Sequence, residues 1–307
     1  MSTQPAARTE PEPSTEDSTV TITGTPAAAA VAASKTPVAA AKKSRGLTGT
    51  LKTVLPPIGV LITAIGIWYL VSYLMLSERR RFLLPPPHEV VEVGMLDWGN
   101  LKEILDGLWM TTIVALSGFA IAIGVGTVFA IMMSQAKWVE RSFYPYAVIL
   151  QTLPILAMTP LVGLWFGYGL SSRIIICTIL GLFPIITSTL FGLKSVEPSQ
   201  RDLFKLMKTG RLERFWRLDL PSALPSILTG LRTSGGLAVI GAIVADFFFR
   251  QGEPGIGRLL DVYRTNLETE RLYTALMFSS LLGVALFVLN TMITQRVLRN
   301  WHASARD

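Results

Sequence analysis

Six long apolar stretches limit what this chain can fold into. Each has about 20 predominantly apolar residues, which an α-helix needs to cross the ~30 Å hydrocarbon core of a bilayer. Half of the 307 residues are apolar and only 16% are charged, so a soluble chain of this length could not bury so much apolar surface. The sequence therefore predicts an all-α, polytopic membrane protein with six transmembrane helices. The expected spans are about Val54–Leu76, Leu108–Met133, Tyr144–Tyr168, Ile174–Leu193, Ile227–Phe248 and Leu272–Val297.

The two ends of the chain differ from this apolar body. Residues 1–50 are rich in Ala, Pro, Thr and Ser and have no apolar periodicity, so we expect a disordered tail. Residues 51–300 form the expected transmembrane domain, and residues 301–307 form a second, short tail. The single cysteine, Cys177, lies in the fourth expected span, so neither a disulfide framework nor a Cys/His metal site is expected.

Lys and Arg residues gather in alternate connections, which predicts the orientation of the spans. They are more frequent before span one, between spans two and three, between spans four and five, and after span six than in the other connections. Under the positive-inside rule these richer segments are cytoplasmic, and so are both termini. Arg79, Arg80 and Arg81, just after span one, weaken this bias locally without reversing it.

The connection between spans four and five, residues 198–225, is long, basic and amphipathic. Leu203 and Met207 recur at helical spacing, Gly210 separates two halves, and Pro221 suits the first turn of a new helix. We expect two short amphipathic helices at the membrane surface, followed by span five. Such helices either contact lipid phosphates or dock a partner protein. The basic residues, at every third position, are Lys205, Lys208, Arg211, Arg214 and Arg217.

This connection resembles the cytoplasmic coupling loop of permease subunits in bacterial ABC importers. In those permeases an acidic residue precedes two small residues, then a glycine and, further on, a Leu-Pro pair. Leu220-Pro221 sets the register here, which places the acid at Asp202 and the glycine at Lys208, with Gly210 offering the turn instead. The small pair is replaced by larger residues. The resemblance implies that the ATPase-coupling residues are Asp202, Leu203, Lys208, Gly210, Arg211, Leu218, Leu220 and Pro221.

Three other segments resemble the same family, in particular its branch for sulfonates, taurine, nitrate and thiamine precursors. They are residues 82–90 (FLLPPPHEV), 153–169 (LPILAMTPLVGLWFGYG) and 220–248, and the resemblance extends over about residues 55–300. It implies the type I ABC importer permease fold and a location in the bacterial cytoplasmic (inner) membrane. The implied partners are a cytoplasmic ATP-binding subunit, an extracytoplasmic substrate-binding protein, a second permease copy in a homodimer and the lipid bilayer, with no nucleic acid.

The sequence contains no phosphate-binding loop of the form G-x-x-x-x-G-K-[ST]. We therefore expect no cofactor on this chain, with ATP and Mg used by the partner ATPase. No catalytic residues are expected, because the two histidines, His88 and His302, both lie outside the expected spans and an intramembrane hydrolase would need a base within them. A secondary transporter or channel without an ATPase is the alternative, although no inverted repeat is evident.

Polar residues inside the spans are candidates for a translocation pathway, because placing them in lipid is costly. Arg232 has the alternative of extending to the inner interface, and Asp246 that of an inter-helix hydrogen bond. The resembling permeases commonly carry an acid at the Asp246 position. The expected solute is small and polar or anionic: a sulfonate, nitrate or bicarbonate, or a pyrimidine or vitamin precursor. The pathway candidates are Gln151, Thr152, Pro154, Arg232, Thr233 and Asp246.

Overall fold

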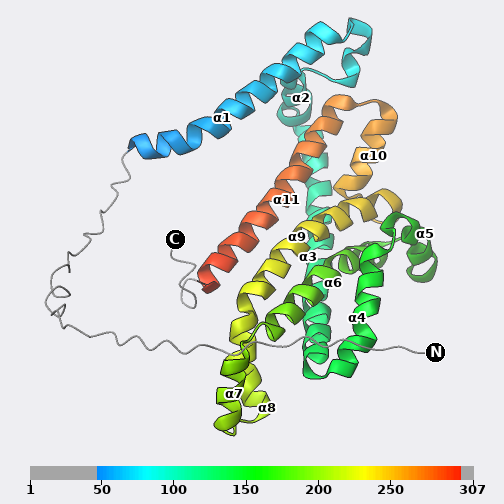
Figure 1. Cartoon of the computed structure of the whole chain (residues 1–307). Helices are drawn as coiled ribbons and strands as arrows, with labels where there is room; N and C mark the ends of the chain where they lie inside the picture. The colour runs from blue at the N-terminus through cyan, green and yellow to red at the C-terminus, as the bar shows by residue number, and fades with distance from the viewer. Residues whose placement is uncertain (1–46, 299–307) are drawn as a thin grey trace, which may run out of the picture. The chain divides into compact units, whose positions relative to one another are not determined.

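The structure, a computed structural model, describes residues 47–298, with side chains from residue 55 onward (Figure 1). Within that range every regular element is a helix. The predicted tails lie outside the described residues, except that 47–50 begin helix α1 (Leu47–Leu70). The chain divides into two units, residues 1–57 and 58–307, and the second unit holds the helix bundle described below.

Five helical segments are long and apolar enough to cross a membrane, and a bent helix pair makes a sixth. They follow the six predicted stretches in order, which confirms the predicted all-α membrane architecture. The first membrane-spanning segment consists of most of α1 and the π-helical turn η1 (Val71–Met75) that follows it. The five segments are Leu55–Met75, Trp98–Gln135 (α3), Leu170–Lys194 (α6), Arg211–Phe248 and Thr269–Leu298 (α11).

The third predicted stretch is not one straight helix. It consists of α4 (Lys137–Thr152) and α5 (Ile155–Phe166), which meet at an angle of 103°. Leu153 and Pro154 both have extended backbone at the break. Proline disfavours the helical conformation in the residue before it and has no N–H for the next helical hydrogen bond, so the chain bends here.

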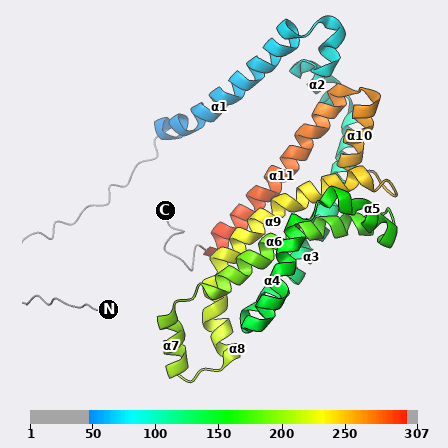
Figure 2. The same cartoon turned by 45° about the vertical axis from the view of Figure 1, so that its right-hand side comes forward.

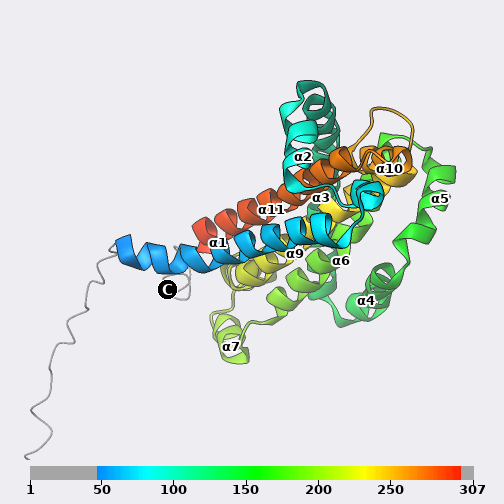
Figure 3. The same ribbon diagram turned by 90° about the horizontal axis from the view of Figure 1, so that it is seen from above.

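Helices α3, α6 and α9 (Leu220–Phe248) form the centre of the bundle (Figures 1 and 2). Seen from above, α4 packs against α3 and α6, and α11 packs against α9 (Figure 3). Apart from Phe119, the main buried cluster is made of small and medium apolar side chains, so the helices approach closely. Its members are Val114, Ala115, Phe119, Ala122, Cys177, Ile185, Ala238, Val239, Ala242 and Leu286.

The contact between α6 and α9 depends on residues with little or no side chain. Ser234 Oγ donates a hydrogen bond to the Gly181 carbonyl at 2.7 Å. A Cβ atom at Gly230 would lie 2.6 Å from Ser188 Cβ and 2.9 Å from the Pro184 carbonyl oxygen. Helices in a bilayer gain no hydrophobic driving force from associating, so such close backbone approach and inter-helix hydrogen bonds hold them together.

Short elements cover one end of the bundle: η2 (Glu78–Leu83), α2 (Pro87–Val91), η3 (Glu92–Leu96) and α10 (Ile256–Asn266). Side chains of the spans fix them, since Ser72 Oγ donates to the Leu84 carbonyl at 2.9 Å and Thr274 Oγ1 to the Val90 carbonyl at 3.2 Å. Residues 198–219, which precede α9, lie at the opposite end from α10 (Figures 1 and 2).

Candidate functional site

Residues 198–225, called the basic loop from here on, contain two short helices before α9. These are α7 (Pro198–Leu206) and α8 (Arg211–Arg214), as the amphipathic pattern predicts. The second helix does not end before Pro221. It continues through a π-helical turn, η4 (Phe215–Asp219), directly into α9. A π turn absorbs an irregularity in the helical hydrogen-bond ladder, and here the Leu220 N–H bonds to the Phe215 carbonyl just before the proline that has no N–H.

The turn between α7 and α8 is a Schellman motif built around Lys208. The Lys208 N–H bonds to the Lys205 carbonyl at 2.9 Å and the Thr209 N–H to the Phe204 carbonyl at 3.2 Å. Lys208 has φ of +53°, the left-handed conformation that this motif usually gives to glycine. Gly210 instead has extended backbone with φ of −66° and precedes α8. The chain therefore turns at Lys208, the position at which the resembling permeases carry glycine. The expectation that Gly210 supplies this turn is wrong.

A buried carboxylate joins the two halves of the basic loop. Asp219, at the end of η4, is 7% exposed and accepts a hydrogen bond from Arg214 Nε at 3.3 Å. Arg201 Nη2 on α7 lies 3.8 Å from the same carboxylate and donates to the Leu193 carbonyl at the end of α6 at 3.0 Å. These contacts tie α7 and α8 to each other and to α6. Asp219 is not among the coupling residues predicted from the sequence, although an acid among basic residues directly before Leu-Pro is a visible signal.

The other predicted coupling residues occupy different environments. Asp202 is exposed and pairs with Lys205 at 2.7 Å, within its own helix. Leu203 and Arg211 are exposed, whereas Leu218 is buried and Leu220 and Pro221 are half-buried. Large apolar side chains project from the loop into the surroundings, and Leu206 is 81% exposed. Exposed apolar side chains interspersed with cations suit contact with a partner surface. The exposed apolar residues are Leu203, Leu206, Met207, Leu212 and Trp216.

Asp246, a predicted pathway residue, lies in a fully buried ion pair. Its Oδ1 is 3.3 Å from Arg173 Nη1, and Thr111 Oγ1 is 2.6 Å from its Oδ2. All three residues are completely buried. Arg173 also donates to the carbonyls of Phe249, Gln251 and Glu253 at 2.7–2.9 Å. The pair thus holds the turn after α9 against α3 and α6. Arg173, the partner of Asp246, is not among the residues predicted from the sequence.

The remaining pathway candidates lie on exposed surfaces of this single chain. Arg232 and Thr233 are neighbours on α9, and the Arg232 guanidinium lies over the Phe287 ring at 4.0 Å. Gln151 and Thr152 are exposed at the end of α4. Pro154, also exposed, lies in the break between α4 and α5. Arg232 precedes Asp246 by about 20 Å of helix at 1.5 Å per residue, so the structure does not bring the two together.

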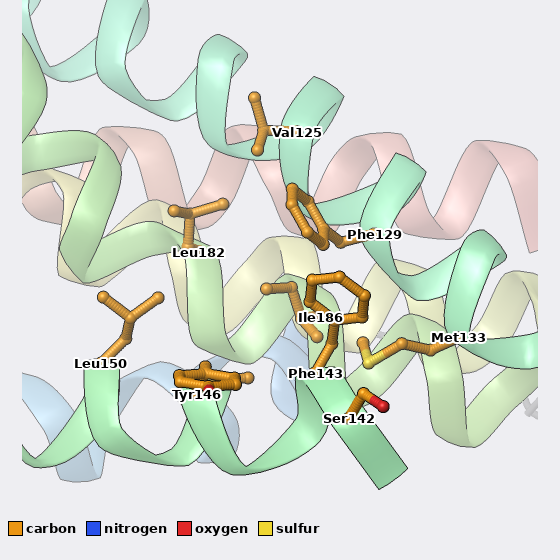
Figure 4. A pocket seen from close by; sticks show the side chains of 10 residues that line it. Val125, Phe129, Met133, Ser142, Phe143, Tyr146, Leu150, Leu182 and Ile186 are labelled. Atoms are coloured by element: carbon orange, nitrogen blue, oxygen red, sulfur yellow. The ribbon is translucent and has the colours of Figure 1, made fainter. Parts of the chain in front are cut away.

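A cavity of about 780 Å³ lies between α3, α4 and α6 (Figure 4). Figure 4 shows side chains from all three helices around it, including Phe129, Tyr146 and Ile186. None of the predicted pathway residues lines it. Its nearly continuous apolar lining suits hydrocarbon chains better than a polar solute. Among the described residues no group of acidic, histidine or cysteine side chains is arranged to hold a metal ion.

Together, the spanning helices define a multi-pass membrane protein with the basic loop at one end. Residues 101–299 match the family described as "Binding-protein-dependent transport system inner membrane component". The chain belongs to this family of inner-membrane transport permeases, as the sequence resemblance predicts.

Curated relatives agree with this assignment. The chain is 35% identical over 205 residues to the formylaminopyrimidine transport permease protein of Halalkalibacterium halodurans, a match that covers 66% of this chain and 80% of the relative. It is 29% identical to the riboflavin transport system permease protein of Chloroflexus aurantiacus, with coverage of 75% and 84%. It is 27% identical to the taurine transport system permease protein of Escherichia coli, with coverage of 81% and 90%.

Solved structures share the fold at low sequence identity. The crystal structure of an amino acid ABC transporter with histidines gives a TM-score of 0.55 at 16% identity, covering 66% of this chain and 97% of that one. The inward-facing MetNI methionine ABC transporter gives a TM-score of 0.50 at 19% identity, covering 66% and 95%. The chain thus has the fold of type I ABC importer permeases.

Proposed function

We propose that this chain forms the translocation pathway of an ATP-driven importer and transmits the motion of a separate ATPase subunit through the basic loop. The observation that carries this proposal is the form of the loop. Helix α7 and its C-cap present Leu203, Leu206 and Met207 outward, and α8 presents Leu212. The Arg201–Asp219–Arg214 contacts bind the loop to the ends of α6 and α9. A loop that is exposed on one side and fixed to the spans on the other can pass a rigid-body displacement to them.

In this proposal the chain itself is not an enzyme, and ATP and Mg are bound by the ATPase. The basic loop and both termini face the cytoplasm, in accord with the positive-inside distribution of Lys and Arg. A second copy of the chain completes the pathway, and an extracytoplasmic binding protein delivers the solute to the end that carries α10. Asp202, Lys208, Arg211 and Leu218 belong to the coupling region, with Gly210, Leu220 and Pro221.

Polar groups on the exposed faces of α4 and α9 supply the proposed pathway lining. Arg232 is the central group, because an exposed charge within a spanning helix is costly in lipid and is tolerated where it faces a polar cavity or a partner subunit. Thr233 on α9 and Gln151 and Thr152 on α4 supply exposed hydroxyl and amide groups. The proposed solute is small and polar or anionic, of the kind that the names of the relatives describe: an aminopyrimidine, a sulfonate or nitrate.

Co-purification of an ATPase in mild detergent tests the coupling role. The wild-type chain is expected to recover an ATP-binding subunit from its native membranes. The double variant Leu203→Glu plus Leu206→Glu places two charges on the docking face and is expected to lose it. Lys205→Gln, on the same helix and with a side chain that is 67% exposed, is the matched control and should retain it. Recovery of no ATPase with any form would contradict the proposal and favour a secondary carrier or channel.

A further inference from the structure

A small polar cavity lies between the basic loop and the ends of two spanning helices. It measures about 210 Å³, well above the ~30 Å³ that one water molecule occupies in the liquid. Its lining is almost wholly polar, in contrast to the apolar cavity between α3, α4 and α6. The residues that line this loop cavity are Ser134 and Gln135 of α3, Leu193 of α6, Arg201 of α7, Arg211 and Arg214 of α8, and Asp219 of η4.

The charges around the loop cavity do not balance. Three guanidinium groups face one carboxylate, which is already shared by Arg201 and Arg214. Within the described residues Arg211 pairs with no carboxylate. Two buried atoms of the lining residues have no hydrogen-bond partner among the described groups, the donor Arg201 Nε and the acceptor Asp219 Oδ1, and the Asp219 carboxylate is already offset by the ion pairs with Arg201 and Arg214. A buried donor without a partner is costly, so an acceptor that enters the cavity would be stabilised there.

The opposing charges are weaker than this excess. Helices α3 and α6 both end at the loop cavity, and a helix C-terminus carries only about half a negative charge. At α6 the Leu193 carbonyl already accepts a hydrogen bond from Arg201. At α3 the Ser134 hydroxyl donates to the Ile131 carbonyl at 2.7 Å. The cavity therefore keeps a net positive charge and spare guanidinium donors.

We propose that the loop cavity binds a phosphate-type oxyanion, held by Arg201, Arg211 and Arg214. Guanidinium groups bind such anions through paired, charge-assisted hydrogen bonds. The oxyanion comes either from free phosphate or from the headgroup of an anionic phospholipid at the membrane surface. In either case it joins α8 to the end of α3, two helices whose described side chains share no ion pair. Occupancy would thereby set how tightly the basic loop follows the spans.

Site-specific labelling tests the site, because the one native cysteine is buried. A thiol introduced by Ser134→Cys reports directly on the loop cavity, and Ser199→Cys, on the outer surface of α7, reports on nonspecific effects. The full chain, with its ATPase subunit, is placed in phosphatidylcholine nanodiscs and labelled with an uncharged maleimide. Inorganic phosphate is added in one arm, and phosphatidylglycerol is included in the nanodisc in another.

Slower labelling of Ser134→Cys, but not of Ser199→Cys, in either arm is the expected result. The arm that gives protection identifies the source of the oxyanion. Unchanged labelling in both arms overturns the proposal. A reference sample in plain phosphatidylcholine nanodiscs that lacks the ATPase subunit is labelled in parallel. If the subunit alone slows labelling, and neither phosphate nor phosphatidylglycerol slows it further, the proposal is also overturned, because a protein group then fills the cavity.

A matched pair of charge variants separates the site from the general basic character of the loop. Arg211→Gln and Arg217→Gln each remove one positive charge from the loop, but only Arg211 lines the loop cavity. Direct binding of phosphate or phosphatidylglycerol, measured by native mass spectrometry on each otherwise wild-type chain, is expected to weaken on the order of tenfold for Arg211→Gln and little for Arg217→Gln. Equal weakening by both variants would show a diffuse electrostatic effect and contradict a built site.

Discussion

At the scale of single residues, two side chains stand out because their backbone or burial is unusual for their chemistry. Lys208 takes a left-handed conformation that favours glycine, and Asp246 is a fully buried carboxylate within a spanning helix. Each has a specific physical explanation in its neighbours. The hydrogen bonds of the Schellman motif require the left-handed backbone of Lys208. The buried carboxylate of Asp246 is paired with Arg173 and hydrogen-bonded by Thr111.

Lys208→Gly is expected to stabilise the turn between α7 and α8. Glycine adopts positive φ without the steric cost of a Cβ atom, which is about 1 kcal/mol for other residues. Hydrogen exchange of the amides of 204–211 should slow by roughly fivefold, since 1.4 kcal/mol corresponds to a factor of ten. Lys208→Val, with a branched side chain at the same position, should speed exchange there. Faster exchange in the glycine variant would contradict the proposed role of the turn.

Asp246→Asn is expected to destabilise the bundle by about 3–5 kcal/mol, because it leaves the buried Arg173 without its counter-charge. In detergent the thermal unfolding midpoint should fall by roughly 10 °C, at about 2–4 °C per kcal/mol. Arg232→Gln serves as the comparison. That residue is exposed, so its change should alter stability by only about 0.5 kcal/mol while reducing solute uptake. Equal loss of stability in both variants would argue against a structural role confined to the buried pair.

At the scale of elements, the close contact between α6 and α9 decides whether the centre of the bundle forms. Ser234 bonds to the Gly181 carbonyl, and Gly230 leaves no room for a side chain beside Pro184. The break between α4 and α5 is a second decisive feature, because it exposes Gln151 and Thr152 at the end of α4.

Gly230→Leu is expected to prevent normal packing of α6 on α9, because its side chain would overlap the backbone of α6 at Pro184. The measurement is the yield of monodisperse protein in size-exclusion chromatography after detergent extraction. Gly236→Leu is the matched control on the same helix, since a Cβ atom there meets nothing within 4 Å. Comparable loss of yield in both variants would show that added bulk on α9, rather than the α6 contact, is responsible.

The helices were largely predictable from the sequence, whereas the contacts between residues of different helices were not. Apolar stretches of span length identify transmembrane helices wherever they lie, so the spans could be placed in order. The bend at Leu153 and Pro154 needs the geometry of the neighbouring helices as well as the proline. The partnership of Arg173 with Asp246 joins two helices that are distant in sequence, and the Asp219 contacts depend on how the basic loop folds back on α6. The residue pattern along the chain does not reveal which residues that are distant in sequence lie close together in the fold.

At the scale of the whole molecule, the helix bundle has two different ends. One carries the basic loop with its exposed apolar and cationic side chains, and the other carries α10 and the turn held by Arg173. The proposed function requires such a difference, because it places the ATPase and the solute supply on opposite faces of the membrane.

The orientation of the two ends is open to direct measurement. Cysteines introduced by Lys205→Cys on α7 and Arg264→Cys on α10 replace side chains that are 67% and 71% exposed. In cells whose outer envelope has been permeabilised while the inner membrane stays sealed, a membrane-impermeant maleimide is expected to label only the cysteine on α10. Disruption of the inner membrane should then expose the α7 position. The reverse order would place the basic loop outside and rule out contact with a cytoplasmic ATPase.

Photo-crosslinking from the basic loop tests the central claim most directly. A photoreactive phenylalanine analogue replaces Leu206, which is on α7 and 81% exposed. In a second, control variant the same analogue replaces Leu164, which is on α5 and 71% exposed. Leu164 lies near the start of α6, whereas the basic loop follows the end of α6. Irradiation of living cells is predicted to give an adduct with an ATP-binding subunit from position 206 and none from position 164. An absence of that adduct at 206, or equal adducts at both positions, would contradict the assignment of the basic loop as the ATPase contact.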